Sequence, residues 1–275
     1  MLKQRVVTAS LMMLTFLIVL FGTPGGVFIL FSGCVFLIGA WEWSDLSGLR
    51  SFSQRVFYVV TCAVLAYIAY RLSHAATDLS LVKLLLIGTC VWWAIALLWI
   101  QGFPSSAILW RPQPIRAAVG ILVIIPSWLS VVYLMQHEDG ALLVLLCLLI
   151  VAAVDVGAYF SGRRFGSRKL APLVSPGKTW EGVWGGLLLS LFVALAYVAV
   201  FSGSVQLVKV FMIAVPVALV SIVGDLLESM IKRERGIKDS GNILPGHGGV
   251  LDRIDGLLPA IPVFSLAILL SQWRF

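Results

Sequence analysis

The chain has 275 residues, of which 60% are hydrophobic and only 12% are charged, and its mean hydropathy is +1.01. A soluble domain with a polar surface cannot be so apolar, so the composition indicates one integral membrane domain over 1–275. The four cysteines lie inside apolar runs and form no CxxC pair, which argues against disulfides and zinc sites.

Apolar runs long enough to span a bilayer, roughly 17 to 25 residues each, recur along the whole chain. They predict an all-α, polytopic transmembrane protein with about nine spans. No small-x-small cleavage pattern follows the first run, so we expect it to remain as an uncleaved helix. The predicted helices are 6–21, 24–43, 56–72, 81–101, 115–135, 140–160, 183–202, 207–227 and 256–273.

The charge distribution predicts the orientation of the spans. With the N-terminus inside, all Lys and Arg except Arg71, Lys83, Lys209 and Arg274 fall on the cytoplasmic side. This asymmetry is typical of a multi-pass protein of the bacterial inner membrane. Most of the net charge of +7 therefore flanks spans, which argues against nucleic-acid binding and favours contact with membrane lipids and polyphosphates.

Two predicted cytoplasmic loops, 161–182 and 228–255, are much more polar than the other connections. We expect the chemistry to lie there, facing the cytoplasm. In this interpretation 141–275 is the catalytic part, whereas 1–140 supplies scaffold helices and a possible dimerisation surface.

The strongest pattern begins at the end of the eighth predicted helix. Asp225, Glu228, Ser229 and Lys232 share one helical face there, and a carboxylate deep in lipid costs roughly 2.5 to 3.5 kcal/mol. The glycine-rich stretch that follows contains His247 and can form an anion-binding concavity. Asp252 and Asp255 then return two carboxylates to the membrane surface, and carboxylates with phosphate oxygens are ligands that Mg²⁺ prefers. The alternative is a solvated helix end with its own ion pairs.

A second polar segment, DVGAYFSGRRFGSRKLAPLVSPGKTWEG, runs from Asp155 to Gly182. Its GKT is not a P-loop, because the glycine required five positions before Gly177 is Pro172. Ser175, Lys178 and Thr179 can still offer hydroxyls, a charge and helix N-terminal amides to a phosphate. Helix capping is the alternative, and Asp155 can be an ion-pair partner of a nearby arginine.

These two segments resemble the phosphatidate cytidylyltransferase (CDP-diglyceride synthase) family. The C-terminal pattern matches the whole family signature, and the earlier segment resembles two further recurring blocks. Before residue 140 the resemblance rests on Trp41-Glu42-Trp43 and the spacing of apolar runs. The matching pattern is Ser229-x-Ile231-Lys232-Arg233-x4-Lys238-Asp239-x-Gly241-x2-Leu244-Pro245-x-His247-Gly248-Gly249-Val250-x-Asp252-Arg253-Ile254-Asp255.

The resemblance implies that CTP and phosphatidic acid are joined to give CDP-diacylglycerol and pyrophosphate. It also implies Mg²⁺, a second, monovalent cation such as K⁺, and a homodimer. On this basis Asp225 and Asp252 are the expected principal metal ligands, with Asp255, Asp239 and Glu228 as secondary ligands or supporting groups. The residues expected to contact substrate phosphates or complete the site are Lys232, Arg233, Lys238, His247, Arg253, Ser175, Lys178, Thr179, Ser229 and Asp155.

The alternatives to this function are another membrane transferase of activated lipids and a transporter. A CDP-alcohol phosphatidyltransferase needs a DGx2AR motif, which Asp255-Gly256 does not begin. A transporter using Asp155 and Asp225 would distribute charge through several helices, whereas the polar residues here gather near the C-terminus.

Overall fold

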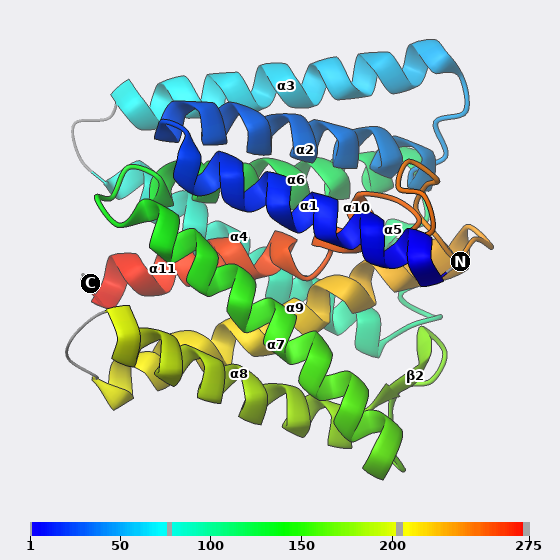
Figure 1. Ribbon diagram of the computed structural model, residues 1–275. Helices are drawn as coiled ribbons and strands as arrows, with labels where there is room; N and C mark the ends of the chain where they lie inside the picture. Colours follow the sequence, from blue (N-terminus) through cyan, green and yellow to red (C-terminus); the bar gives the residue numbers. More distant parts are fainter. Residues whose placement is uncertain (1, 76–78, 202–205, 272–275) are drawn as a thin grey trace.

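The computed structural model describes residues 2–75, 79–201 and 206–271 (Figure 1). Within these ranges the chain forms long helices and one small hairpin, which confirms the predicted all-α membrane fold. The elements are α1 (Leu2–Gly22), α2 (Gly25–Leu46), α3 (Phe52–Ala75), α4 (Ser80–Gln101), α5 (Ala107–Trp110), α6 (Gln113–Leu134), α7 (Gly140–Phe165), β1 (Lys169–Ala171), β2 (Ser175–Thr179), α8 (Trp180–Phe201), α9 (Leu207–Glu234), α10 (Leu251–Ile254) and α11 (Leu257–Ser271).

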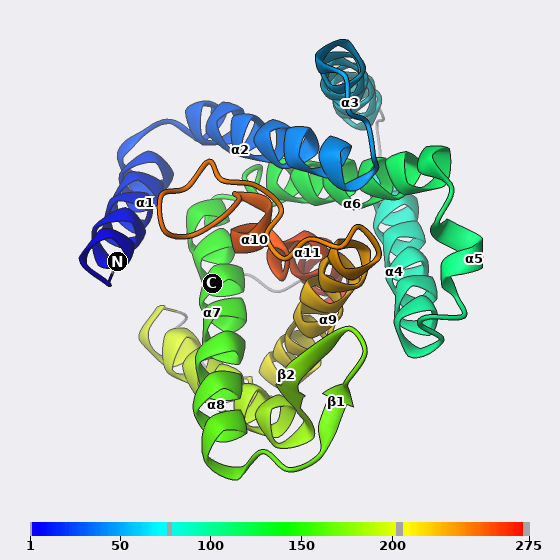
Figure 2. The same cartoon turned by 90° about the vertical axis from the view of Figure 1, so that its right-hand side faces the viewer.

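The long helices run back and forth across the molecule, so their connections gather at two ends (Figure 1). One end carries the start of α1, the hairpin and the polar loop 235–250. Figure 2 looks onto this end and shows α10 and α11 near its centre, with α2 on one side and α7 on another. We call it the polar end.

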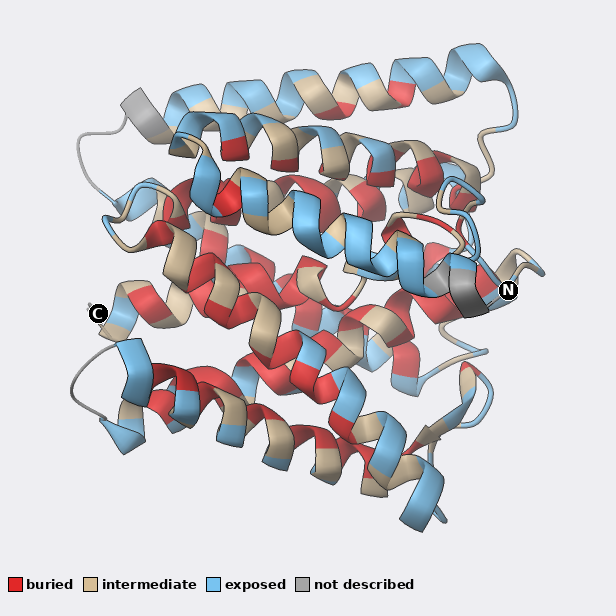
Figure 3. Cartoon of the chain, viewed as in Figure 1, coloured by how far each residue is buried: buried red, intermediate tan, exposed pale blue. Residues whose placement is uncertain are grey.

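Burial is concentrated around α6, α9 and α11, whereas α3 is exposed along most of its length (Figure 3). Eight of the described helices are long and apolar enough to cross a membrane, and the apolar part of α1, Val6–Gly22, is shorter. Large apolar side chains such as Leu30, Phe57 and Leu188 are at least 71% exposed on these helices. Such surfaces suit contact with lipid chains, and the protein is a membrane protein.

Close packing of α7 on α8 sets the position of Asp155. A Cβ at Gly157 would lie 2.5 Å from the carbonyl oxygen of Gly185, so only glycine lets the two backbones approach this closely. Small residues at crossing points are the usual means of close helix packing in membranes. This contact brings the end of α7 beside the hairpin that precedes α8.

Several helices extend beyond their predicted ends. The sequence prediction ended the eighth helix at 227, but α9 continues to Glu234 and is about 42 Å long at 1.5 Å per residue. Helix propensity and the packing of its polar end carry it past the apolar run that marked the span. Similarly, α7 continues to Phe165 and α8 begins at Trp180 rather than 183.

The 161–182 loop contains a structure that the apolar pattern did not predict. β1 and β2 form an antiparallel hairpin in which Lys169 pairs with Thr179 and Ala171 with Ser175. The hairpin places the SPGKT residues on β2, directly before α8, and points the segment back toward α9.

Candidate active site

Asp225 of α9 is held by residues from two segments. Its Oδ2 lies 2.6 Å from Nζ of Lys178 at the end of β2, and its Oδ1 accepts a hydrogen bond of 3.1 Å from Ser229 Oγ, one helical turn later. The Lys178 and Asp225 side chains are 25% and 33% exposed. The hairpin therefore brings a lysine from the second polar segment onto the first carboxylate of the C-terminal pattern.

A cavity of about 220 Å³ opens beside this ion pair. Asp155 and Tyr159 line it from α7, Lys178 and Thr179 from the hairpin, and Asp225 from α9. Asp155 and Tyr159, four residues apart, thus lie on one face of α7. Asp155 lies close enough to Asp225 and Lys178 for their charges to interact. One wall of the cavity is acidic, and its one ammonium group is already paired with a carboxylate.

Lys232 organises a second, more buried group of charges. Its Nζ lies 2.7 Å from Asp252 Oδ1 and 3.1 Å from Glu228 Oε1, and the three side chains are at most 10% exposed. Neither oxygen of Glu228 has a partner with hydrogen-bond geometry among the described residues. One ammonium thus faces two buried carboxylates, and Glu228 retains unused acceptor capacity.

Backbone amides hold Asp252 in place. Its carboxylate accepts hydrogen bonds from Gly249 N at 2.8 Å and from Ser240 N at 3.0 Å. Gly248 lies between these donors with a φ of +83°, which glycine adopts without strain. A Cβ at this position would also approach Asp252 Oδ2 to 2.8 Å. The glycine-rich loop therefore wraps around the carboxylate, as an anion-binding concavity would.

Asp255 connects the two groups. It lies near enough to Asp225, Lys178 and Lys232 for their charges to interact. The charge of Glu228 interacts with those of Asp255 and Asp252. Asp255 Oδ1 accepts a hydrogen bond of 2.7 Å from Gly256 N. Each of these carboxylates thus lies within electrostatic reach of the next, and we call them the carboxylate row. Its members are Asp155, Asp225, Asp255, Glu228 and Asp252, whereas the predicted Asp239 is not among them. In the part of the chain that the structure describes, no three acidic, His or Cys side chains are arranged to hold a metal by themselves.

The remaining predicted residues surround this row at different distances from it. Arg233 Nε donates to the carbonyl of Val174, and Arg253 Nη2 donates to the carbonyl of His247 at 2.7 Å. His247 has a buried Nδ1 without a hydrogen-bond partner among the described residues. Ser175 begins β2, and the hydroxyl of Thr179 caps α8 by accepting from Gly182 N, which bears out the capping alternative for this residue. Lys238 and Asp239 lie on the exposed side of the loop.

One contributor was missed by the sequence interpretation. Glu42, near the end of α2, is 2% exposed and accepts hydrogen bonds from Val250 N and Leu251 N at the start of α10. Trp41-Glu42-Trp43 was noticed only as part of a resemblance. A glutamate inside an apolar run, with no nearby basic residue in sequence, was the available signal that it had a distant partner.

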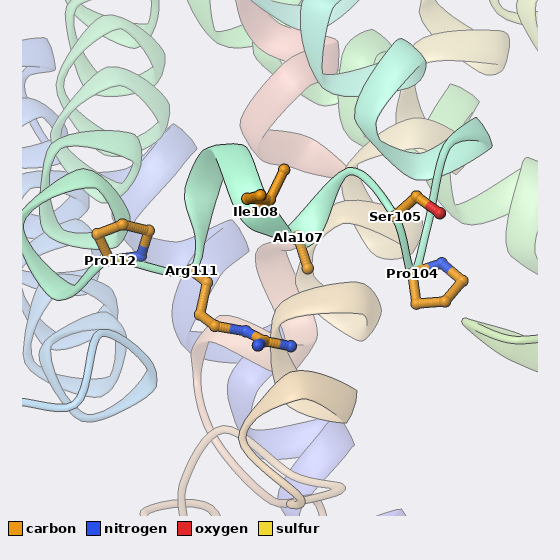
Figure 4. Close-up of a pocket in the computed structure, with 6 residues that line it drawn as sticks. All are labelled: Pro104, Ser105, Ala107, Ile108, Arg111 and Pro112. Atoms are coloured by element: carbon orange, nitrogen blue, oxygen red, sulfur yellow. The ribbon is translucent and has the colours of Figure 1, made fainter.

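A second hollow of about 460 Å³ lies beside α5 and contains none of the predicted site residues (Figure 4). Pro104, Ile108 and Arg111 are among its lining residues. The guanidinium of Arg111 pairs with Glu234 at 2.6 Å. This contact fixes the end of α9 against α5, outside the carboxylate row.

Comparison with known proteins identifies relatives over almost the whole chain. The model of the cytidylyltransferase family matches residues 3–271. A phosphatidate cytidylyltransferase of Pseudomonas aeruginosa is 45% identical over 274 residues, 99% of each chain. Proteins of the same name from Haemophilus influenzae and Brucella suis are 39% and 36% identical, over 96% and 88% of this chain and 98% and 84% of their own lengths.

Replacing Lys232 by methionine should strongly destabilise the folded protein. The change keeps an unbranched side chain but leaves Glu228 and Asp252 buried without their ammonium, and breaking a buried pair in this way costs about 3–5 kcal/mol. We expect a clearly lower midpoint of thermal unfolding in detergent. Lys169→Met, on the exposed side of β1, is the control and should change little.

Adding Glu228→Gln to Lys232→Met should recover part of the lost stability, because it removes one of the two unpaired charges. An unchanged midpoint in Lys232→Met would contradict the inferred role of this lysine.

Proposed function

We infer that this chain, which belongs to the cytidylyltransferase family, transfers the cytidylyl group of CTP to phosphatidic acid. A phosphate oxygen of the lipid bonds to the α-phosphorus of CTP, the bond from that phosphorus to the β-phosphate bridging oxygen breaks, and pyrophosphate leaves. CDP-diacylglycerol is the lipid product. The observation that carries this function is the ion pair between Lys178 and Asp225, which joins the two polar segments beside a cavity at the polar end. The buried group of Lys232, Glu228 and Asp252 lies at the same end.

The attacking phosphate is already an anion near neutral pH, so no Ser, Cys or His nucleophile is required. The chemistry needs two polyanions to be neutralised and aligned. We propose that Lys178, next to the cavity, binds a substrate phosphate and leaves Asp225 free to bind a cation. Lys232 keeps Asp252 and Glu228 in place, and Arg233, Lys238, Arg253 and His247 extend the phosphate-binding surface.

The carboxylate row fits a divalent cation. Five carboxylates face two paired lysines, and Glu228, whose Oε1 pairs with Lys232, keeps a buried Oε2 without a partner that meets hydrogen-bond geometry among the described residues. Mg²⁺ is usually bound by one or two carboxylates together with substrate phosphates, so substrate oxygens would complete its coordination here. We propose Asp225, Asp252, Asp255 and Glu228 as its holders.

When held by these residues, Mg²⁺ would supply positive charge that neutralises the substrate phosphates and stabilises the leaving group. The family resemblance also implies a second position for a monovalent cation such as K⁺. Asp225 pairs with Lys178, whereas Asp252 pairs with Lys232. We propose that the bound cation and substrate connect these two ion-paired groups into one site.

We also propose that the protein lies in the inner membrane with its polar end in the cytoplasm. The start of α1, the hairpin and the 235–250 loop share one end (Figure 1), and the positive charge of the sequence gathers there. Thr8 Oγ1 donates to the carbonyl of Pro245 at 3.3 Å, which supports the common location of α1 and the loop. CTP is a cytoplasmic nucleotide and would reach the cavity from this side.

A homodimer would form through the N-terminal helices. α3 supports this proposal because only 11% of its apolar window is buried within the chain. The mass of the protein in lipid nanodiscs would decide it, and a single-chain mass would contradict it.

The orientation can be tested with single cysteines at exposed positions 242 and 138, which lie at opposite ends of the molecule. In intact spheroplasts, a membrane-impermeant maleimide should label Glu138→Cys and spare Asn242→Cys, whereas opened membranes should label both. Wild-type protein gives the background from the native cysteines. Labelling at 242 from outside would reverse the topology.

The reaction is tested by incubating purified protein with labelled CTP, phosphatidic acid and Mg²⁺. We expect CDP-diacylglycerol and pyrophosphate in equal amounts. Turnover without phosphatidic acid, or a product that retains the β-phosphate, would rule out the proposed reaction.

Asp225→Asn and Asp252→Asn should each lower kcat on the order of 10²–10³-fold, since each removes a charge that positions the reacting phosphates. Because the two carboxylates would act through one site, the double variant should lose little beyond either single variant. Asp139→Asn at the opposite end is the matched control. Losses that multiply in the double variant would mean that the two aspartates act independently.

A further inference from the structure

Glu42 is a buried carboxylate supplied by the N-terminal half of the chain to the C-terminal loop. Its Oε2 accepts from Leu251 N at 2.7 Å and from Ser240 Oγ at 3.3 Å, and its Oε1 accepts from Val250 N at 3.0 Å. It makes no ion pair with the described residues. An unpaired carboxylate near a membrane is costly unless hydrogen bonds satisfy it, so these three donors account for its burial.

The donors of Glu42 alternate with those of Asp252. Ser240 gives its backbone N–H to Asp252 and its hydroxyl to Glu42, while Gly249 N bonds to Asp252 and the next two amides bond to Glu42. Ser240 and the segment 249–251 therefore each bind both Glu42 and Asp252, and we call this arrangement the clamp. Because α10 has no side-chain cap of its own, Glu42 supplies the missing acceptor from another helix.

Two loop glycines leave the space that Glu42 occupies. A Cβ at Gly241 would lie 2.5 Å from Glu42 Oε1, and one at Gly249 would lie 2.6 Å from Oε2. Neither glycine has a positive φ, unlike Gly246 and Gly248 in the same loop. The glutamate thus fills the space beside Gly241, and the glutamate together with the Ser240 hydroxyl fills the space beside Gly249.

We propose that Glu42 is a positioning residue for the cytidylyl transfer. It acts through the 240–251 loop: its bonds to Ser240 Oγ and to the amides of Val250 and Leu251 fix the two segments whose other amides, at Ser240 and Gly249, orient Asp252. Through Asp252, it also positions Lys232. This role rests on the proposed function of the site, but the clamp itself is a structural property that can be measured without substrate.

The test uses Glu42→Gln in the full-length protein in nanodiscs, with two measurements. An amide at this position presents an NH₂ group to one of the backbone donors and so releases it. We expect hydrogen–deuterium exchange of peptides covering 249–251 to become at least several-fold faster without substrate or metal. Since loss of a group that orients a ligand typically costs about 10–100-fold, kcat should fall by that factor, with the apparent KM for phosphatidic acid changed less than about twofold.

Gly241→Ala offers an independent variant that leaves the carboxylate intact. Its methyl group should displace Glu42 and give the same faster exchange and lower kcat. Glu138→Gln, an exposed glutamate at the opposite end, is the control and should change neither measurement.

Unchanged exchange in Glu42→Gln would overturn the clamp, whatever the activity. Faster exchange with wild-type kcat would overturn the positioning role. If the wild-type protein transferred no cytidylyl group, the proposed function would fail, while the exchange measurement would still decide whether Glu42 holds the loop.

Discussion

The polar end of this protein depends on one constraint: a buried charge must have a partner. Lys232, Glu228 and Asp252 are nearly inaccessible, and their mutual distances of 2.7 and 3.1 Å satisfy the lysine more fully than the carboxylates. A buried ion pair is weak evidence for stability because desolvation offsets the attraction. The presence of this group at the end of a membrane-spanning helix is better explained by the chemistry that the excess negative charge permits.

The fold delivers these charges by extending helices beyond the apolar core. α9 carries its spanning segment first and its polar residues last, whereas Asp252 and Asp255, in α10 and directly after it, precede the apolar helix α11. α9 and α11 pack against each other, and Gly224 allows α9 to approach the backbone at Asp255 closely. Asp225 and Asp255, thirty residues apart in sequence, thus lie close enough for their charges to interact. The glycine-rich loop lies between them in the sequence.

Sequence patterns were sufficient for the spans and for the two polar segments, because both depend on local composition. The common face of Asp155 and Tyr159 also followed from helical spacing. The hairpin at 169–179 was not predicted, since its strands have only three and five residues and β2 contains Pro176. The pairing of Lys178 with Asp225 could not be predicted either, because it depends on the direction in which that hairpin returns. Sequence spacing indicated which residues carry charge, but only the packing indicated which charges meet.

Glu42 is a second contact that could not be predicted from sequence spacing. Its three hydrogen bonds join positions some two hundred residues apart, and no local pattern encodes them. Two ion pairs act at the same end of the molecule: Arg235 approaches Asp45 of α2 at 3.8 Å, and Glu234 binds Arg111 after α5. The loop that holds Asp252 is therefore fixed at its start by the end of α9 and at its finish by Glu42. The helices expected to serve as a scaffold thus contact the site directly, and the geometry of the carboxylate row depends on the N-terminal half as much as on the segment that contains it.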